Sequence, residues 1–463
     1  MTAARSTAAV VADAWWTKRR GRAAIDRRQR SRFRDMVAFA RAESPFYREL
    51  YRGLPNDADD PAMLPVSDKR MLMARFDDWC TERALSFNGV ETVIADPARV
   101  GERILGRYTA VTTSGTTGRR GVFLIDPPTR MVVNAMAGRM LASWLAPSDV
   151  VKLARARCRM AMVMASEGHF ASSVAAAQLK RQRGERVEVL SARMPLPEIV
   201  SRLNRFQPAF LAPYASMAAL LADEQAAGRL RIAPVLLALS AEGLAVAEYR
   251  RIAGIFGAKV GNSYAASECP FLSYSCDHDW LHVNADWVLV EPVDADHRPV
   301  PPGTPSHTVL ISNLVNRVQP ILRYDLGDGV LERPDPCPCG NPLPAIRVQG
   351  RAADVLTFRR SDGTSVRIAP LALSAALDGV DGVTLAQVVQ AAPHRLALRL
   401  KLAPGADADR AWGDATSGLA VLLAEHGLET VAVDRDERPP EQSPGGKFRE
   451  VIPLPEKRRE GEE

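Results

Sequence analysis

Short apolar runs alternate with amphipathic segments through the middle of the chain, and this alternation constrains the fold more than any other feature. The runs at 160–165 (MAMVMA) and 186–191 (RVEVLS) indicate strands, and residues 172–183 and 197–206 indicate helices. PAFLAPY, PVLLALS and AKVGNSY continue the pattern as three more strands. Because strands separated by helices favour parallel pairing, we expect an α/β fold of mostly parallel sheets flanked by helices.

The pattern changes in the last third of the chain. After Asp286 the runs WVLVEPVD, HTVLISNL and GVLERP indicate a β-rich subdomain with hairpins. From about Arg351 a smaller α+β unit begins, with strands near VLTFRR, LAQVVQAA and LALRLKLA and a helix at 409–425. At 463 residues the chain exceeds a typical single domain. We therefore expect a large N-terminal domain (1–350) and a small, mobile C-terminal domain (351–463).

The composition is that of an ordinary soluble globular protein, with 46% hydrophobic and 25% charged residues. No apolar run approaches the roughly 20 residues needed to span a bilayer. The apolar stretch near the start is interrupted by Asp13 and followed by basic residues, which is the wrong order for a secretory signal. We expect a cytoplasmic protein with no membrane partner.

The net charge of +6 is unevenly spread. Residues 1–41 hold eleven Lys and Arg against three Asp. Trp15, Trp16 and Phe33 follow a helical pattern instead of the interleaved pattern of a base-stacking platform. A helix with a solvated basic face is therefore expected, and nucleic-acid binding is not.

The stretch TTSGTTGRRG, residues 112–121, is dense in Gly, Ser and Thr and follows a β-prone run. The residues expected to contact phosphate are Thr113, Ser114, Gly115, Thr116, Thr117 and Gly118. Glycines let the backbone fold tightly and aim N–H groups outward, and the hydroxyls donate to anionic oxygens, so the loop is suited to phosphate. It is not a Walker loop, since no lysine follows the last glycine of a GxxxxGK[ST] frame. A polar turn between two strands is the alternative.

Five motifs in order resemble the adenylate-forming superfamily of acyl-CoA synthetases and ligases. The SGTTG segment resembles its phosphate loop, and NSYAASE, RYDLGD, QGRAAD and SPGGKFR follow at 262–268, 323–328, 349–354 and 443–449. SPFYREL, LPVSDKRML and CPCG are similar to the phenylacetate-CoA ligase-like branch. The resemblance spans nearly the whole chain. It implies an ATP-dependent, AMP-forming ligase that activates a carboxylic acid as its acyl-adenylate, releases pyrophosphate and transfers the acyl group to a nucleophile.

The resemblance also implies a role for each motif residue. Tyr264 would stack on the adenine and Asn262 would bind its edge, while Ser267 would contact the α-phosphate and Glu268 would hold Mg²⁺. Asp328 would take the ribose hydroxyls, since a carboxylate accepts two hydrogen bonds. The remaining nucleotide contacts implied are the phosphate loop, Ala241, Glu242 and Arg351.

Lys447 is the expected catalytic lysine, acting with Glu268 and Thr116. Attack of a carboxylate on the α-phosphate of ATP builds negative charge on oxygen, and an ammonium group on a mobile loop neutralises that charge. The alternative is a surface lysine in a Gly/Pro-rich loop. For the acyl pocket the resemblance implies His169, Phe170, Tyr214 and Ala265, the last standing where the family has glycine.

Cysteines and histidines suggest a second metal. Six cysteines in a chain of this size do not form a disulfide framework. Cys276, His282, Cys337 and Cys339 make the tetrahedral thiolate and imidazole set of a closed, structural zinc site. His278 is the alternative imidazole ligand, and cysteines without metal are the alternative interpretation.

The acceptor of the acyl group is less well defined. Ala353 stands at the hinge position where the family usually has Asp or Lys, so CoA, a carrier-protein thiol and an amine all remain open as acceptors. Whether the protein forms a homodimer is a separate question that also remains open. A third function class is a nucleotide-binding homologue without turnover. The joint presence of Lys447, Glu268, Asp328 and Arg351 argues against that class.

Overall fold

The computed structural model describes most of the chain. The described ranges are 6–55, 60–113, 120–164, 168–192, 194–240, 243–244, 246–351, 354–360, 362–368, 370–377, 380–441 and 448–454. None of the described helices combines the length and apolarity needed to cross a bilayer.

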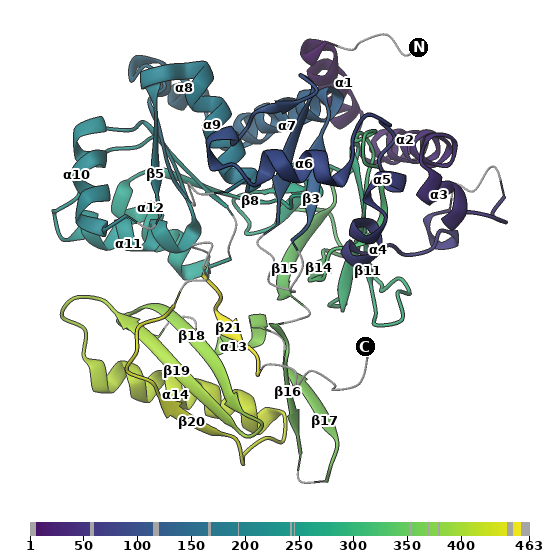
Figure 1. Ribbon diagram of the computed structural model, residues 1–463. Helices are drawn as coiled ribbons and strands as arrows, with labels where there is room; N and C mark the ends of the chain where they lie inside the picture. Colours follow the sequence, from purple (N-terminus) through teal and green to yellow (C-terminus); the bar gives the residue numbers. More distant parts are fainter. Residues whose placement is uncertain are drawn as a thin grey trace.

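Helices form the N-terminal part of the chain (Figure 1). They are α1 (Thr7–Arg19), α2 (Arg22–Glu43), α3 (Pro45–Leu50), α4 (Lys69–Ala74), α5 (Phe76–Trp79) and α6 (Phe87–Ile94), with short 3-10 turns at Pro61–Met63 and Pro97–Arg99. The buried Arg32 of α2 anchors this layer, because its guanidinium pairs with Asp13, donates to the Asp286 carbonyl and lies 3.3 Å from the centre of the Trp287 ring. The expected N-terminal helix is confirmed.

The described residues form a nine-stranded sheet at the centre of the molecule. Its parallel strands lie in the order β5 (Val187–Ser191), β4 (Met160–Met164), β6 (Phe210–Pro213), β7 (Leu236–Ser240) and β8 (Lys259–Tyr264). The intervening helices are α9 (Ala171–Arg183), α10 (Leu196–Phe206), α11 (Ala215–Ala226) and α12 (Val246–Phe256), with a 3-10 turn at Gly184–Arg186. These are the strands and helices that the sequence pattern predicts, so the α/β class is confirmed.

Beyond β8 the same sheet continues with antiparallel strands. In order they are β9 (Ser273–Ser275), β10 (Leu281–Val283), β15 (Ala345–Arg351) and β14 (Asp328–Glu332). Two further antiparallel sheets pack nearby, β1 (Arg103–Ile104) with β2 (Tyr108–Thr112) and β3 (Val122–Ile125), and β11 (Val288–Val293) with β12 (Thr308–Asn313) and β13 (Ile321–Asp325). Two helices, α7 (Pro127–Trp144) and α8 (Pro147–Arg155), follow β3. The β-rich region after Asp286 is therefore present as predicted.

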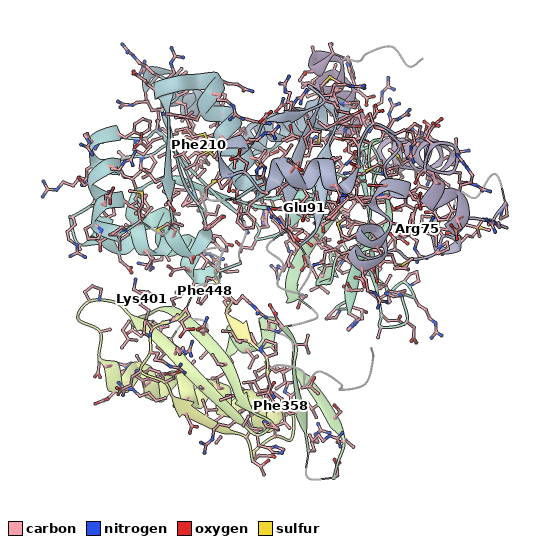
Figure 2. The ribbon with its side chains drawn as sticks, viewed as in Figure 1. Arg75, Glu91, Phe210, Phe358, Lys401 and Phe448 are labelled. Carbon is pink, nitrogen blue, oxygen red and sulfur yellow. The ribbon has the colours of Figure 1, made fainter. Side chains whose placement is uncertain are left out.

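The residues after Arg351 form a unit with its own sheets and core. It contains β16 (Leu356–Arg359), β17 (Ser365–Ile368), α13 (Pro370–Leu377), β18 (Val383–Ala392), β19 (Arg395–Leu402), α14 (Ala408–Glu425), β20 (Ala432–Arg435) and β21 (Val451–Ile452). Its core packs Leu396, Leu398 and Leu419 against Trp412, apart from the cores of the larger part. Figure 2 shows Lys401 and Phe448 on the side of this unit that faces the larger part.

Candidate functional site

The base of the Gly/Ser/Thr loop is closed by a pair of hydrogen bonds between its two ends. The backbone N–H of Thr113 donates to the Gly121 carbonyl at 3.0 Å, and the Gly121 N–H donates to the Thr113 hydroxyl at 2.9 Å. The hairpin register of β2 and β3 continues this closure, with Thr112 opposite Val122. Ser114, Gly115, Thr116, Thr117 and Gly118 lie outside the described residues. The loop thus connects β2 to β3, and the two hydrogen bonds between Thr113 and Gly121 hold its ends together.

Three of the predicted nucleotide residues come together at the end of β8. The Tyr264 hydroxyl donates to Asp328 Oδ2 at 2.6 Å. Asp328 begins β14, where its backbone lies opposite Arg351 at the end of β15. The motifs NSYAASE, RYDLGD and QGRAAD therefore meet at one place, although they are well separated in the chain.

Asn262 leaves a polar atom unsatisfied beside this cluster. Its side-chain N–H donates to the Tyr249 hydroxyl at 3.0 Å, and its backbone N–H donates to the Ser275 hydroxyl at 2.9 Å. Its side-chain carbonyl oxygen is buried and has no partner among the described residues. Buried polar atoms in native proteins are almost always hydrogen-bonded, so this oxygen is an acceptor available to a bound ligand.

Glu268 lies between the nucleotide residues and the loop, with only 6% of its surface exposed. Its Oε1 accepts a hydrogen bond from the Tyr324 hydroxyl at 2.9 Å. The neighbouring Ser267 hydroxyl donates to the Thr112 carbonyl at 3.3 Å, which fixes this segment to the end of β2. Burial raises the pKa of Glu268, the charge of Asp328 raises it further, and Lys69 opposes the shift. The carboxylate is therefore one that a nearby cation would stabilise.

Lys69 is a site residue that the sequence analysis did not identify. Its side chain packs against Gly121, where an added Cβ would lie 3.1 Å from the lysine Cδ, and its charge acts on Glu268. In the sequence it is one basic residue at the start of a short helix capped by Asp68. It belongs to the LPVSDKRML segment, but the segment alone gives the lysine no role, because only the approach of α4 to the loop brings it near Glu268.

The predicted acyl-pocket residues lie near the carboxyl ends of the parallel strands. Phe170 forms a bridge with Thr112 and Tyr214 forms one with Ser240, while the Tyr214 hydroxyl is 3.2 Å from the Ser172 hydroxyl. Ala265 is exposed directly after β8. Ala241 and Glu242, predicted to border the adenine, lie outside the described residues.

The His169 ring is buried, with its Nε2 3.3 Å from the Asp96 carbonyl. Burial lowers the pKa of His169, which favours a neutral ring. Its backbone carbonyl accepts a 2.7 Å hydrogen bond from Thr112, so the residue also supports the end of β2.

The four predicted zinc ligands are brought together by three neighbouring strands. Cys276 follows β9, His282 lies in β10, and Cys337 and Cys339 precede β15. All four ligand atoms lie within 4.8 Å of one another, with Cys276 Sγ 3.7 Å from Cys337 Sγ and His282 Nε2 3.1 Å from Cys339 Sγ. His282 Nδ1 is 3.0 Å from the Leu343 carbonyl, which orients Nε2 toward the sulfurs. Three thiols and one imidazole fit a structural zinc, and His278 is not part of the group.

The segment that carries Lys447 is fixed at both ends by one buried glutamine. The Gln387 side chain on β18 donates to the carbonyls of Glu441 at 3.0 Å and Arg449 at 2.9 Å, and accepts from the Glu441 N–H at 3.1 Å. Lys447 itself lies outside the described residues, as does Ala353. Gln387 was not identified from the sequence, because a glutamine in a strand gives no local indication of which loop it will meet.

Solved structures provide the similarity that sequence comparisons do not. No protein-family model and no curated protein sequence matches the chain. The chain is similar to a 2-hydroxyisobutyryl-CoA ligase in the postadenylation state with R3-HIB-AMP, at 21% identity and a TM-score of 0.67, over 94% of this chain and 89% of the ligase. An open conformation of that ligase with 2-HIB-AMP and CoA gives 22% identity and a TM-score of 0.56, over 93% and 91%.

A second ligase is a more distant match. The anthranilate-CoA ligase AuaEII with anthranoyl-AMP gives 14% identity and a TM-score of 0.50, over 73% of this chain and 64% of the ligase. The chain therefore has the fold of these CoA ligases, which is the fold that the resemblance predicts.

Proposed function

We propose that the protein is an ATP-dependent, AMP-forming ligase that activates a carboxylic acid as an acyl-adenylate. The observation that carries the proposal is the 2.6 Å hydrogen bond between Tyr264 and Asp328, in a segment whose Ser267 donates to Thr112 at the base of the Gly/Ser/Thr loop. An aromatic ring, a ribose-binding carboxylate and a phosphate-type loop in one place are the parts that adenosine triphosphate needs. The similarity to ligases solved with acyl-AMP compounds supports the same chemistry.

The individual residues have distinct roles in this proposal. The unsatisfied Asn262 oxygen accepts from the adenine amino group, and Asp328 exchanges Tyr264 for the ribose hydroxyls. Bound Mg²⁺ would neutralise phosphate charge, with Glu268 as its carboxylate ligand. The Gly/Ser/Thr loop, Ser267 and Lys69 surround the phosphates, while Phe170, Tyr214, Ala265 and the segment at His169 form the acyl side.

The C-terminal unit from about Arg351 is proposed to be a separate, small domain that delivers Lys447 to the α-phosphate. Gln387 supports this role, because it fixes the residues on either side of the segment containing the lysine. CoA is the proposed acceptor, supported by the names of the similar ligases. Zinc at Cys276, His282, Cys337 and Cys339 is proposed to be structural, since four protein ligands leave no position for substrate.

Pyrophosphate release across a panel of aliphatic and aryl acids, each with and without CoA, tests the proposal. An active acid should release pyrophosphate at a rate that Lys447→Ala lowers by about a hundred-fold or more, the scale of one positioned charge donor. Release without any CoA-thioester product, but with capture by an added amine, would assign an N-acyl ligase instead. Absence of acid-dependent release with every acid would contradict the proposed function.

Gln387→Ala provides a second test of the lysine-bearing segment. It should lower the adenylation rate with little effect on ATP affinity, because the lysine would no longer be held near the α-phosphate. Gln390→Ala is the matched control, since Gln390 is a buried glutamine on the same strand that bonds instead to Thr357. Equal losses of rate in both variants would indicate that Gln387 only stabilises the strand.

A further inference from the structure

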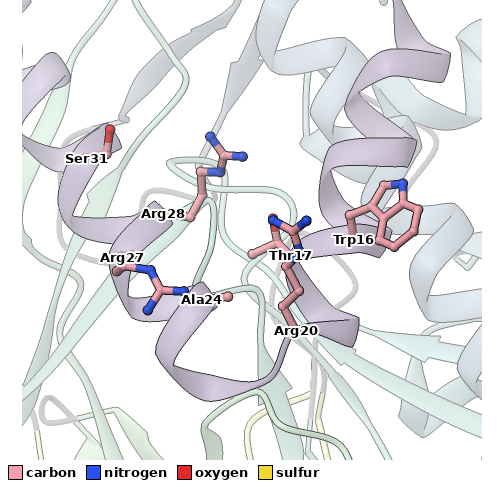
Figure 3. A pocket seen from close by; sticks show the side chains of 7 residues that line it. All are labelled: Trp16, Thr17, Arg20, Ala24, Arg27, Arg28 and Ser31. Carbon is pink, nitrogen blue, oxygen red and sulfur yellow. The ribbon is translucent and has the colours of Figure 1, made fainter.

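A cavity bordered by three arginines lies where α1 and α2 meet, and none of the candidate nucleotide residues lines it (Figure 3). Its volume is about 210 Å³, far more than one water molecule requires. The side chains that line it are Trp16, Thr17, Arg20, Ala24, Arg27, Arg28 and Ser31. Three arginines, a threonine and a serine thus line one space, and none of the residues that line it is acidic.

The arginines of this cavity are incompletely paired. Arg28 has a carboxylate partner, Asp13 at 2.6 Å, but Asp13 also pairs with Arg32. Neither Arg20 nor Arg27 makes an ion pair with a carboxylate within the described ranges. Like charges held together without a counter-charge repel one another, so a bound anion would relieve an unfavourable arrangement.

Thr17 adds a largely buried polar side chain to this lining. Only 5% of its surface is exposed, it lines the cavity, and its hydroxyl has no hydrogen-bond partner among the described residues. The adjoining start of α2 is also open, because its N-cap Gly21 provides no side-chain hydrogen bond and its first turn has no acidic residue. A helix start of this kind attracts negative charge, and the charged side chains beside it in the cavity lining are arginines, which also favour an anion.

We propose that this cavity binds a phosphate-type oxyanion of a small molecule. Arg20 and Arg27 would donate charge-assisted hydrogen bonds, and the Thr17 hydroxyl would donate a third. The Trp16 ring, 56% exposed with the Arg20 guanidinium 6.0 Å from its centre, offers a flat surface to a base attached to the phosphate. The ligand is therefore either a bare oxyanion such as pyrophosphate or the phosphate end of a nucleotide. This site is independent of the proposed ligase activity.

Calorimetric titration of the full chain with inorganic pyrophosphate, and separately with ADP, tests the proposal. R20Q/R27Q should weaken pyrophosphate binding at the cavity by about ten-fold or more, the scale of one charge-assisted hydrogen bond. R30Q/R34Q is the matched control, because it removes the same amount of charge as R20Q/R27Q. Both arginines are exposed on α2 and neither lines the cavity. T17V tests the hydroxyl with no change of charge. Binding at the nucleotide site of the proposed ligase is common to all these variants and does not affect their comparison.

The outcomes separate the two ligand sources. Equal affinity for ADP and pyrophosphate identifies a bare oxyanion, whereas tighter ADP binding that W16A removes identifies a nucleotide. Equal weakening by R20Q/R27Q and R30Q/R34Q would mean that binding reflects only the net charge of the helix, and would overturn the proposal. Unchanged binding in R20Q/R27Q would overturn it as well.

Discussion

At the scale of single residues, the carboxylate of Glu268 is buried and hydrogen-bonded among the candidate nucleotide residues. Burial and Asp328 raise its pKa, yet it keeps a 2.9 Å hydrogen bond from Tyr324 and lies beside the segment fixed to the end of β2. A carboxylate in this environment is costly when ionised and gains most from a divalent cation.

We predict that Glu268→Gln lowers Mg²⁺-dependent ATP turnover by at least about ten-fold and changes the melting temperature little. The glutamine oxygen still accepts from Tyr324, whereas a hard divalent ion prefers an anionic oxygen. Turnover as a function of magnesium concentration measures the effect. Glu291→Gln is the control, as it alters a buried carboxylate outside the site. Identical magnesium dependence in wild type and Glu268→Gln would count against the assignment.

Glu291 permits a prediction about pH. Burial is the largest cause of a pKa raised to about 7, and the charge of Arg323, 3.2 Å away, opposes the shift. One carboxylate oxygen of Glu291 is buried without a partner among the described residues. Asp60 adds to the increase. Between its ordinary pKa of 4.5 and about 7 the folded state binds more protons than the unfolded state, so stability falls as pH rises through this window.

Full ionisation of Glu291 in the folded protein should lower the free energy of unfolding by about 3 kcal/mol relative to the protonated group. Glu291→Gln should therefore match wild type near pH 4.5 and become relatively more stable by pH 8. Melting temperatures of both proteins across this range measure the difference. A difference that does not change with pH would show that Glu291 does not titrate in this window.

At the scale of elements, the sequence predicted the five parallel strands because each is a short apolar run between helices. It did not predict β9 and β10, which have three residues each and are too short to show a period. It also gave no strand order, since pairing across the sheet depends on tertiary contacts between distant segments. The meeting of Tyr264 with Asp328, 64 residues apart, was expected only through family resemblance. Lys69 and Gln387 were missed for the same physical reason.

The short strands β9 and β10 give a prediction about metal. They hold Cys276 and His282 against the loop of Cys337 and Cys339, in a region with few apolar side chains of its own. We predict about one zinc per chain and a lower melting temperature after chelation, because metal binding contributes to folding energy.

Elemental analysis of protein purified without chelator measures the content. Cys339→Ser should lower it strongly, whereas Cys158→Ser, outside the cluster, should leave it unchanged. Absence of zinc from the wild-type protein would contradict the prediction.

At the scale of the whole molecule, the C-terminal unit lies below the larger part in Figure 1, and an ion pair joins the two. Lys401 on β19 lies 3.4 Å from Asp223 on α11, and Asp223 also pairs with Arg251 on α12 at 3.0 Å. A cavity of about 320 Å³ lies beside this contact, between α12 and the start of β18. A void beside this ion pair indicates that this part of the contact is not closely packed.

The C-terminal unit is proposed to move, because Lys447 must reach the α-phosphate and then be withdrawn before an acceptor can enter. A second arrangement of the unit is therefore expected.

We predict that Lys401→Gln shifts the unit away from this orientation. A partly exposed ion pair contributes roughly 0.5 to 1 kcal/mol, so the population of the second arrangement should rise about two- to five-fold. Fluorophores introduced by unnatural amino acids at the exposed positions Val150 and Val421 report the distance between the two parts. Free wild-type protein should give two distances, and ATP should change their ratio.

Arg395→Gln is the matched control, because Arg395 lies on the same strand as Lys401 and its ion pair with Asp434 on β20 is within the unit. The control should leave the two populations as they are in wild type. An equal shift in both variants would mean that loss of charge, and not loss of the Asp223 contact, changes the orientation. A single distance under all conditions would mean that the C-terminal unit is fixed, so that Lys447 could not be withdrawn to admit an acceptor.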